Sequence, residues 1–139
     1  MTEKMTHHEA LIYVMVTMSA VDRTMTDPEL ARIGEIVSNL PVFTDFDQKR
    51  LVKTAEACGE ILSVDDGLDQ VLLLVRESLP KKLHETAYAV ALEIAAADRA
   101  VRPEEIRFLE LLSDSLALDR LTTSAIERTR PIVAPAASA

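Results

Sequence analysis

The amino-acid sequence predicts an all-α protein of about seven helices, and two observations lead to this class. Among the 139 residues, Leu and Ala each occur 18 times, whereas Gly occurs 3 times and Pro 6 times. This composition favours helices and disfavours collagen-like, disordered and turn-rich all-β chains. Apolar residues also recur every three or four positions along most of the chain, and no long stretch alternates with period two.

The first three helices are predicted over residues 7–20, 27–39 and 47–62, each with an apolar stripe at helical spacing. The stripes are Leu11, Val14 or Met15, and Met18; Leu30, Ile33, Val37 and Leu40; and Leu51, Ala55, Cys58 and Leu62. Pro41 lies between the second and third stripes. A proline there does little harm, because a residue between helices does not need its N–H for the helical ladder.

Four more helices are predicted over 67–78, 81–96, 103–117 and 121–129. Their stripes are Leu68, Val71, Leu72 and Val75; Leu83, Ala87, Val90 and Ile94; Ile106, Leu109, Leu112 and Leu116; and Leu121, Ala125 and Ile126. The connections between the predicted helices are short. We therefore expect neighbouring helices to pack as nearly antiparallel hairpins.

Charge, cysteine content and length limit the functional classes. We expect one domain over 1–130 and a loose C-terminal tail over 131–139, where the chain is small and uncharged. The net charge of −8 argues against nucleic-acid binding, which needs clustered Lys and Arg. The apolar stretch 11–21 is about half a membrane span, so we expect no transmembrane segment, while a peripheral membrane contact stays open. The single cysteine, Cys58, and the polar N-terminus point to the cytoplasm.

Residues 8–42 and 84–118 form an internal repeat with an offset of 76 positions. Eight pairs are identical: His8/His84, Glu9/Glu85, Val14/Val90, Ala20/Ala96, Asp22/Asp98, Arg23/Arg99, Glu29/Glu105 and Leu40/Leu116. The apolar positions of the two segments also match. We expect two related helical hairpins with two inserted helices between them, packed with rough two-fold symmetry.

The connection inside each hairpin is repeated too. The first copy is Ala20-Val-Asp-Arg-Thr-Met-Thr-Asp-Pro-Glu-Leu30, and the second is Ala96-Ala-Asp-Arg-Ala-Val-Arg-Pro-Glu-Glu-Ile106. Thr26 and Glu29 have the spacing of a capping box, which starts a helix. In the second copy Pro103 falls at the first helical position, where proline is favoured, but Arg102 is a poor N-cap.

Helix capping does not account for Asp22 and Asp98, which lie four residues before each cap. The pattern is Ala-Ala-Asp, with Val21 in the middle position of the first copy, then a short turn, a small apolar residue, a polar helix start and a Glu seven residues after the Asp. Its double occurrence in a helical chain of this size resembles the TerB-like tellurite-resistance family, which includes the N-terminal domain of DjlA-type co-chaperones. The resemblance covers about residues 7–120. It implies a small bacterial helical domain, encoded near stress or tellurite-resistance genes, whose acidic loops bind a divalent cation.

The acidic residues of the two loops are the candidate metal ligands, and Ca²⁺ or Mg²⁺ would suit their oxygen atoms. They are Asp22, Glu29, Asp98 and Glu105. Alternatively, the Glu residues only cap helices and each Asp accepts backbone N–H bonds in its turn. Arg23 and Arg99 stand where the family has Gly. These arginines either alter the turn or pair with the carboxylates in the place of a cation.

Other polar residues are expected to have structural roles. His8 and His84 are expected to be solvated residues of a first helical turn, with a shared transition metal as the alternative. Cys58 is expected to be a small buried hydrophobe rather than a reactive thiol. Asp65 and Asp66 are expected to cap the helix that follows them.

No recognised catalytic pattern occurs in the sequence, so we expect no enzymatic activity. The leading functional hypothesis is a non-catalytic interaction or stress-response module, tuned by a cation and bound to a protein partner or to a second copy in a homodimer. The alternative hypothesis is a purely structural or scaffold domain without a metal site.

Overall fold

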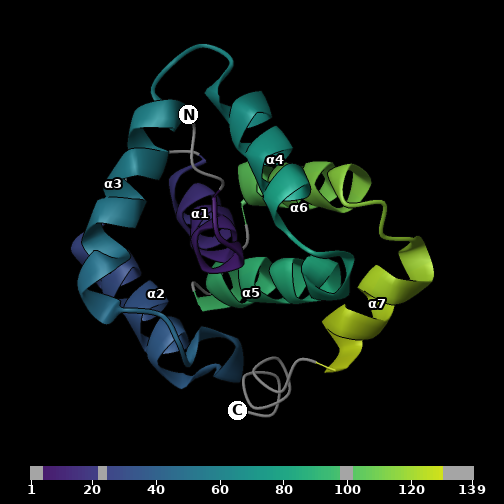
Figure 1. Ribbon diagram of the computed structural model, residues 1–139. Coiled ribbons are helices and arrows are strands. Elements are labelled where there is room, and N and C mark those ends of the chain that lie inside the picture. Colours follow the sequence, from purple (N-terminus) through teal and green to yellow (C-terminus); the bar gives the residue numbers. More distant parts are fainter. Residues whose placement is uncertain (1–4, 22–24, 98–101, 130–139) are drawn as a thin grey trace.

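The computed structural model describes residues 5–21, 25–97 and 102–129, and it confirms the all-α prediction (Figure 1). Within these residues there are seven α-helices and no strand: α1 (His7–Ala20), α2 (Asp27–Asn39), α3 (Leu51–Leu62), α4 (Gly67–Ser78), α5 (His84–Ala97), α6 (Pro103–Ser115) and α7 (Arg120–Thr129). The expected tail, 131–139, lies outside the described residues.

Two helices begin later than the apolar periodicity predicts. Residues Gln48–Arg50 form a 3₁₀ turn before α3, and residues Lys81–Leu83 form another before α5. The Asp47 carboxylate accepts a hydrogen bond from the Lys49 N–H at 3.0 Å and so caps the first turn. A 3₁₀ turn keeps a nearly helical spacing of side chains, so periodicity alone does not separate it from the α-helix that follows.

The Asp65-Asp66 segment was expected to cap α4 through its carboxylates, and this is wrong for Asp66. Asp66 occupies the N-cap position, but its side chain makes no capping bond and instead accepts from Nε2 of Gln70 at 2.8 Å. Gly67 follows it where the chain passes close to the backbone of Ile61. A Cβ at Gly67 would clash with that backbone, so the α3–α4 turn requires glycine here.

α1 lies in the middle of the molecule and is buried all the way round (Figure 1). Ten consecutive residues of α1, from Ala10 to Ser19, are buried. α2, α3, α4 and α5 all contact it. A helix surrounded in this way needs apolar residues on every side, and therefore the sequence of α1 extends beyond a single stripe.

The two hairpins predicted from the repeat are α1–α2 and α5–α6, and their first helices, α1 and α5, pack against each other. α3 and α4 are the two inserted helices. α3 packs on α1, and α7 packs on α5. The two-fold relation between the hairpins stays a prediction.

The repeated histidines join the beginning of each hairpin to its end. The Val42 carbonyl lies 2.8 Å from Nε2 of His8, and in the second hairpin His84 has the carbonyls of Leu116 and Leu79 at 3.2 and 3.1 Å. The expectation that both histidines are solvated is therefore wrong, because both rings are partly buried and bonded to the main chain. Nε2 of His8 and both ring nitrogens of His84 are hydrogen-bonded to carbonyls, and a transition metal shared by the two histidines would have to replace such a bond at His84.

The end of α6 generates a testable prediction, because Ala117 has a φ of 57°. This left-handed conformation disfavours residues with a Cβ, and helices usually place glycine there. We expect Ala117→Gly to raise the free energy of unfolding by roughly 0.5–1 kcal/mol, measured by urea denaturation. Ala125→Gly, at an exposed position within α7, is the matched control and should lower stability by about the same amount. Equal effects of the two substitutions on the free energy of unfolding would contradict the left-handed conformation of Ala117.

Candidate functional site

Glu29 and Glu105, two of the four predicted ligands, lie at equivalent positions in the first turns of α2 and α6. Oε1 of Glu29 accepts from the Thr26 N–H at 2.7 Å, and the Thr26 hydroxyl accepts from the Glu29 N–H at 3.3 Å. The predicted capping box of α2 is therefore confirmed. The other two ligands, Asp22 and Asp98, lie outside the described residues, as do Arg23 and Arg99.

The second connection keeps only half of the capping box. Oε1 of Glu105 accepts from the Arg102 N–H at 2.9 Å. An arginine side chain has no acceptor, so it cannot return a bond to the Glu105 N–H. Glu105 is nevertheless buried, with 6% of its surface exposed, and it is the only buried charged residue in the part of the chain that the structure describes. The second loop therefore holds its carboxylate deeper in the protein than the first.

The chemistry of these side chains suits a hard cation, since Ca²⁺ and Mg²⁺ take carboxylate oxygens. Among the residues that the structure describes, however, no three His, Cys, Asp or Glu residues come close enough to hold a metal ion. Glu29 and Glu105 would therefore need Asp22 and Asp98 to complete a site. The capping bonds show that each glutamate helps to start a helix, and they are not evidence for a bound metal ion.

Cys58 is fully buried on α3, as the sequence predicts. Its sulfur lies 3.6 Å from the Thr17 hydroxyl and 3.8 Å from the Tyr13 carbonyl of α1. Burial raises the pKa of the Cys58 thiol to about 11. The thiol therefore stays protonated near neutral pH, and it serves packing between α1 and α3 rather than nucleophilic chemistry.

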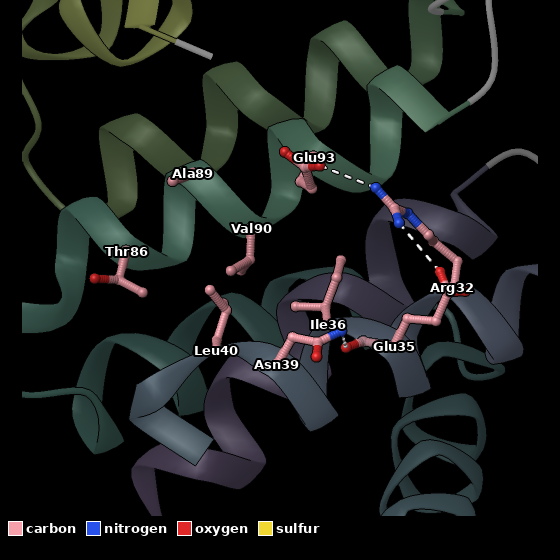
Figure 2. Close-up of a pocket in the computed structure, with 9 residues that line it drawn as sticks. All are labelled: Arg32, Glu35, Ile36, Asn39, Leu40, Thr86, Ala89, Val90 and Glu93. Carbon is pink, nitrogen blue, oxygen red and sulfur yellow. Dashed lines mark hydrogen bonds and ion pairs between the residues drawn. The ribbon is translucent and has the colours of Figure 1, made fainter. Parts of the chain in front are cut away.

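An open groove of about 620 Å³ lies between α2 and α5, one helix from each hairpin (Figure 2). The lining residues are Arg32, Glu35, Ile36, Asn39, Leu40, Thr86, Ala89, Val90 and Glu93. At one end Arg32 donates to Glu93 of α5 at 2.9 Å and to Glu35 of its own helix at 3.1 Å. Figure 2 shows Arg32 between these two carboxylates. The Arg32–Glu93 ion pair ties the two hairpins together beside the groove.

Sequence reasoning did not find this groove. The spacing of Arg32 and Glu35 fits a local pair on one helix face, and it could have been noticed. Glu93 is 61 residues from Arg32, and nothing in the sequence links them. The groove depends on how α2 and α5 cross, which is set by packing against α1.

The family model described as Tellurite resistance protein TerB matches residues 8–128 of the chain. The match includes all seven helices except the first residue of α1 and the last of α7. The chain belongs to the TerB family. No curated protein and no solved structure gives a significant match.

Within this TerB domain, two further hollows lie at corresponding places in the repeats. One, of about 550 Å³, lies between α1, α2 and α3 and is lined partly by Val16 and Leu30. The other, of about 750 Å³, lies between α5, α6 and α7 and is lined partly by Leu92 and Ile106. These residues differ by the repeat offset of 76, so α7 covers the second hairpin as α3 covers the first.

The TerB domain has no helix, within the part that the structure describes, that is long and apolar enough to cross a membrane.

The Arg32 ion pairs should stabilise the TerB domain measurably. The Arg32 side chain is 34% exposed and that of Glu93 is 26% exposed, whereas the Arg107–Glu110 pair is 68% and 61% exposed and 3.4 Å long. Exposed pairs contribute about 0–1 kcal/mol, and removing one partner of a less exposed pair costs more because it leaves the other charge unpaired. We expect Arg32→Gln to lower the free energy of unfolding by about 1 kcal/mol and Arg107→Gln by less than about 0.5 kcal/mol. Thermal unfolding of both variants measures this, and equal losses would contradict it.

Proposed function

We propose that this TerB domain is a non-catalytic interaction module of a stress response, located in the cytoplasm and acting by binding a protein partner. The observation that carries the proposal is the TerB match over 8–128, whose description names tellurite resistance. The α2–α5 groove supports it, because an apolar surface with a charged rim is typical of protein contacts.

We further propose that the repeated loops bind a divalent cation, Ca²⁺ or Mg²⁺, through Asp22, Glu29, Asp98 and Glu105. Glu29 and Glu105 support this because they occupy equivalent positions at the end of each loop. Oxygen ligands from two loops provide the charge that such a cation requires. The cation would fix the two loops relative to each other and so tune the interaction surface.

A purely structural role for the loops is the second candidate. The capping bonds of Thr26 with Glu29 and of Arg102 with Glu105 favour it, because they give both glutamates a role without a metal. Arg23 and Arg99 also favour it, since guanidinium groups pair well with carboxylates.

The two candidates differ in the response of the melting temperature to cations. If a cation binds only the folded state, Ca²⁺ or Mg²⁺ stabilises the protein by mass action, by about 2.7 kcal/mol at a hundred times the dissociation constant. We expect Asp22→Asn with Asp98→Asn to abolish this response while helix content is kept. Asp65→Asn with Asp114→Asn removes the same charge from two exposed positions and is the matched control.

Identical melting in millimolar Ca²⁺, in Mg²⁺ and in EDTA would reject the cation and leave the structural role of the loops. In that case Arg23→Gly with Arg99→Gly provides a second test, because it frees the carboxylates and relaxes the turns. A cation response that appears only in this double variant would show that the arginines occupy the place of the cation.

A further inference from the structure

The two helices that form the α2–α5 groove carry a large share of the negative charge of the protein. Together they contain five acidic residues and one basic residue, a net charge of −4 out of the −8 of the whole chain. The acidic residues are Asp27, Glu29, Glu35, Glu85 and Glu93. The basic residue, Arg32, is already bonded to Glu35 and Glu93. Of these acidic residues only Glu35 and Glu93 line the groove itself, where together with Arg32 they leave a net charge of −1. The rim of the groove is therefore weakly acidic and favours a basic occupant.

The floor of the groove is apolar. Ile36 of α2 and Leu40, the extended residue that directly follows α2, face Ala89 and Val90 of α5. Ile36 and Val90 are themselves buried, so the half-buried Leu40 and Ala89 provide most of the apolar surface that an occupant can reach. Figure 2 shows Leu40 and Val90 pointing toward each other across the open space, with Arg32 and Glu93 at one end. An occupant of this groove needs apolar side chains in its middle and positive charge beside them.

A helix fits such a groove better than an extended peptide. An extended peptide that binds by backbone pairing needs the edge of a sheet, and the described part of the chain has no strand. A helix satisfies its own backbone and offers apolar side chains one turn apart. The occupant is therefore expected to be an amphipathic helix with basic residues.

α7 has these properties and presents them outward. It is the only one of the seven described α-helices with a net positive charge, from Arg120 and Arg128 against Glu127. Leu121 is 83% exposed, the largest value among the exposed large hydrophobic residues of the described chain. With Ala125, one turn later, it forms an apolar centre between the two arginines.

The opposite side of α7 holds it on its own molecule. The Tyr88 hydroxyl of α5 donates to Glu127 at 2.7 Å, and burial together with this carboxylate raises the pKa of Tyr88. Arg120, Leu121, Ser124, Ala125 and Arg128 line a second hollow of about 510 Å³, and Arg120 and Ser124 also border the hollow between α5, α6 and α7. In Figure 1 α7 lies at the edge of the molecule, and Arg120, Leu121, Ala125 and Arg128 are exposed.

We propose that α7 of one copy of this chain docks in the α2–α5 groove of a second copy. Leu121 and Ala125 cover the apolar floor at Ile36, Leu40 and Val90, and the two arginines of α7 lie against the acidic residues of α2 and α5. The inference rests on the proposed interaction function and names its partner as the same chain. Because the two surfaces differ, each copy supplies a donor helix and an acceptor groove.

Sedimentation of the purified full chain over a range of concentrations tests this. We expect self-association that weakens as salt increases, because the Debye length falls from about 10 Å at 0.1 M to about 3 Å at 1 M salt. Leu121→Glu places a negative charge on the docking face of α7, and Glu35→Arg places a positive charge on the rim of the groove. Each should weaken association by at least about tenfold, or about 1.4 kcal/mol. Leu73→Glu on α4 and Glu60→Arg on α3 change exposed residues away from both surfaces and should leave association unchanged.

Mixing the two defective variants gives the decisive result. Leu121→Glu keeps an intact groove and Glu35→Arg keeps an intact α7, so the mixture should form mixed complexes although neither variant associates alone. Circular dichroism confirms that both variants are folded. A monomer at all concentrations would overturn the inference and leave the interaction function to a foreign partner. A different outcome would also overturn the inference: Leu121→Glu abolishes association, Glu35→Arg preserves it, and Leu121→Glu stays monomeric in the mixture. This outcome would indicate a contact between the α7 helices of two copies.

Discussion

The complete burial of α1 is the constraint on which the other helices depend. An α-helix that is apolar on every side is stable in water only when neighbours cover each side, and α2, α3, α4 and α5 do so. The few polar groups of α1 must then find partners inside the protein. Thr17 contacts the sulfur of Cys58, whereas the hydroxyl of Ser19 has no partner among the described residues. The buried part of α1, from Ala10 to Ser19, therefore offers no surface to a partner.

The sequence predicted most of the fold because helix positions follow from local information. Apolar spacing located α1, α2 and α4 at their observed bounds, and the Thr26–Glu29 spacing located the start of α2. The errors come from features that need the third dimension. The bonds of His8 and His84 join residues about 32 to 34 positions apart. The α2–α5 groove forms where Arg32 and Glu93, 61 residues apart, meet at the partly exposed boundary of the two hairpins, so the sequence did not predict it. The four predicted cation ligands stay a prediction.

The two repeats share a framework and differ in their functional surfaces. Both have a histidine that bonds to the end of the hairpin, and both have a glutamate in the first turn of the second helix. The full capping box at Thr26 becomes a half box at Arg102, where Glu105 is buried. The TerB family match spans both hairpins, and the contact between α1 and α5 is the joint on which the loops and the groove both depend.

Native-state hydrogen exchange tests this central claim most directly. If the α1–α5 contact holds both repeats in one cooperative unit, the slowest amides of α1 and α5 exchange together, through global unfolding. Their free energies of opening should equal the free energy of unfolding from denaturant titration and should shift equally when the core is destabilised. Protection of the α1–α2 hairpin that is lost well before protection of α5–α6 would contradict the account, because the repeats would then be independently stable units.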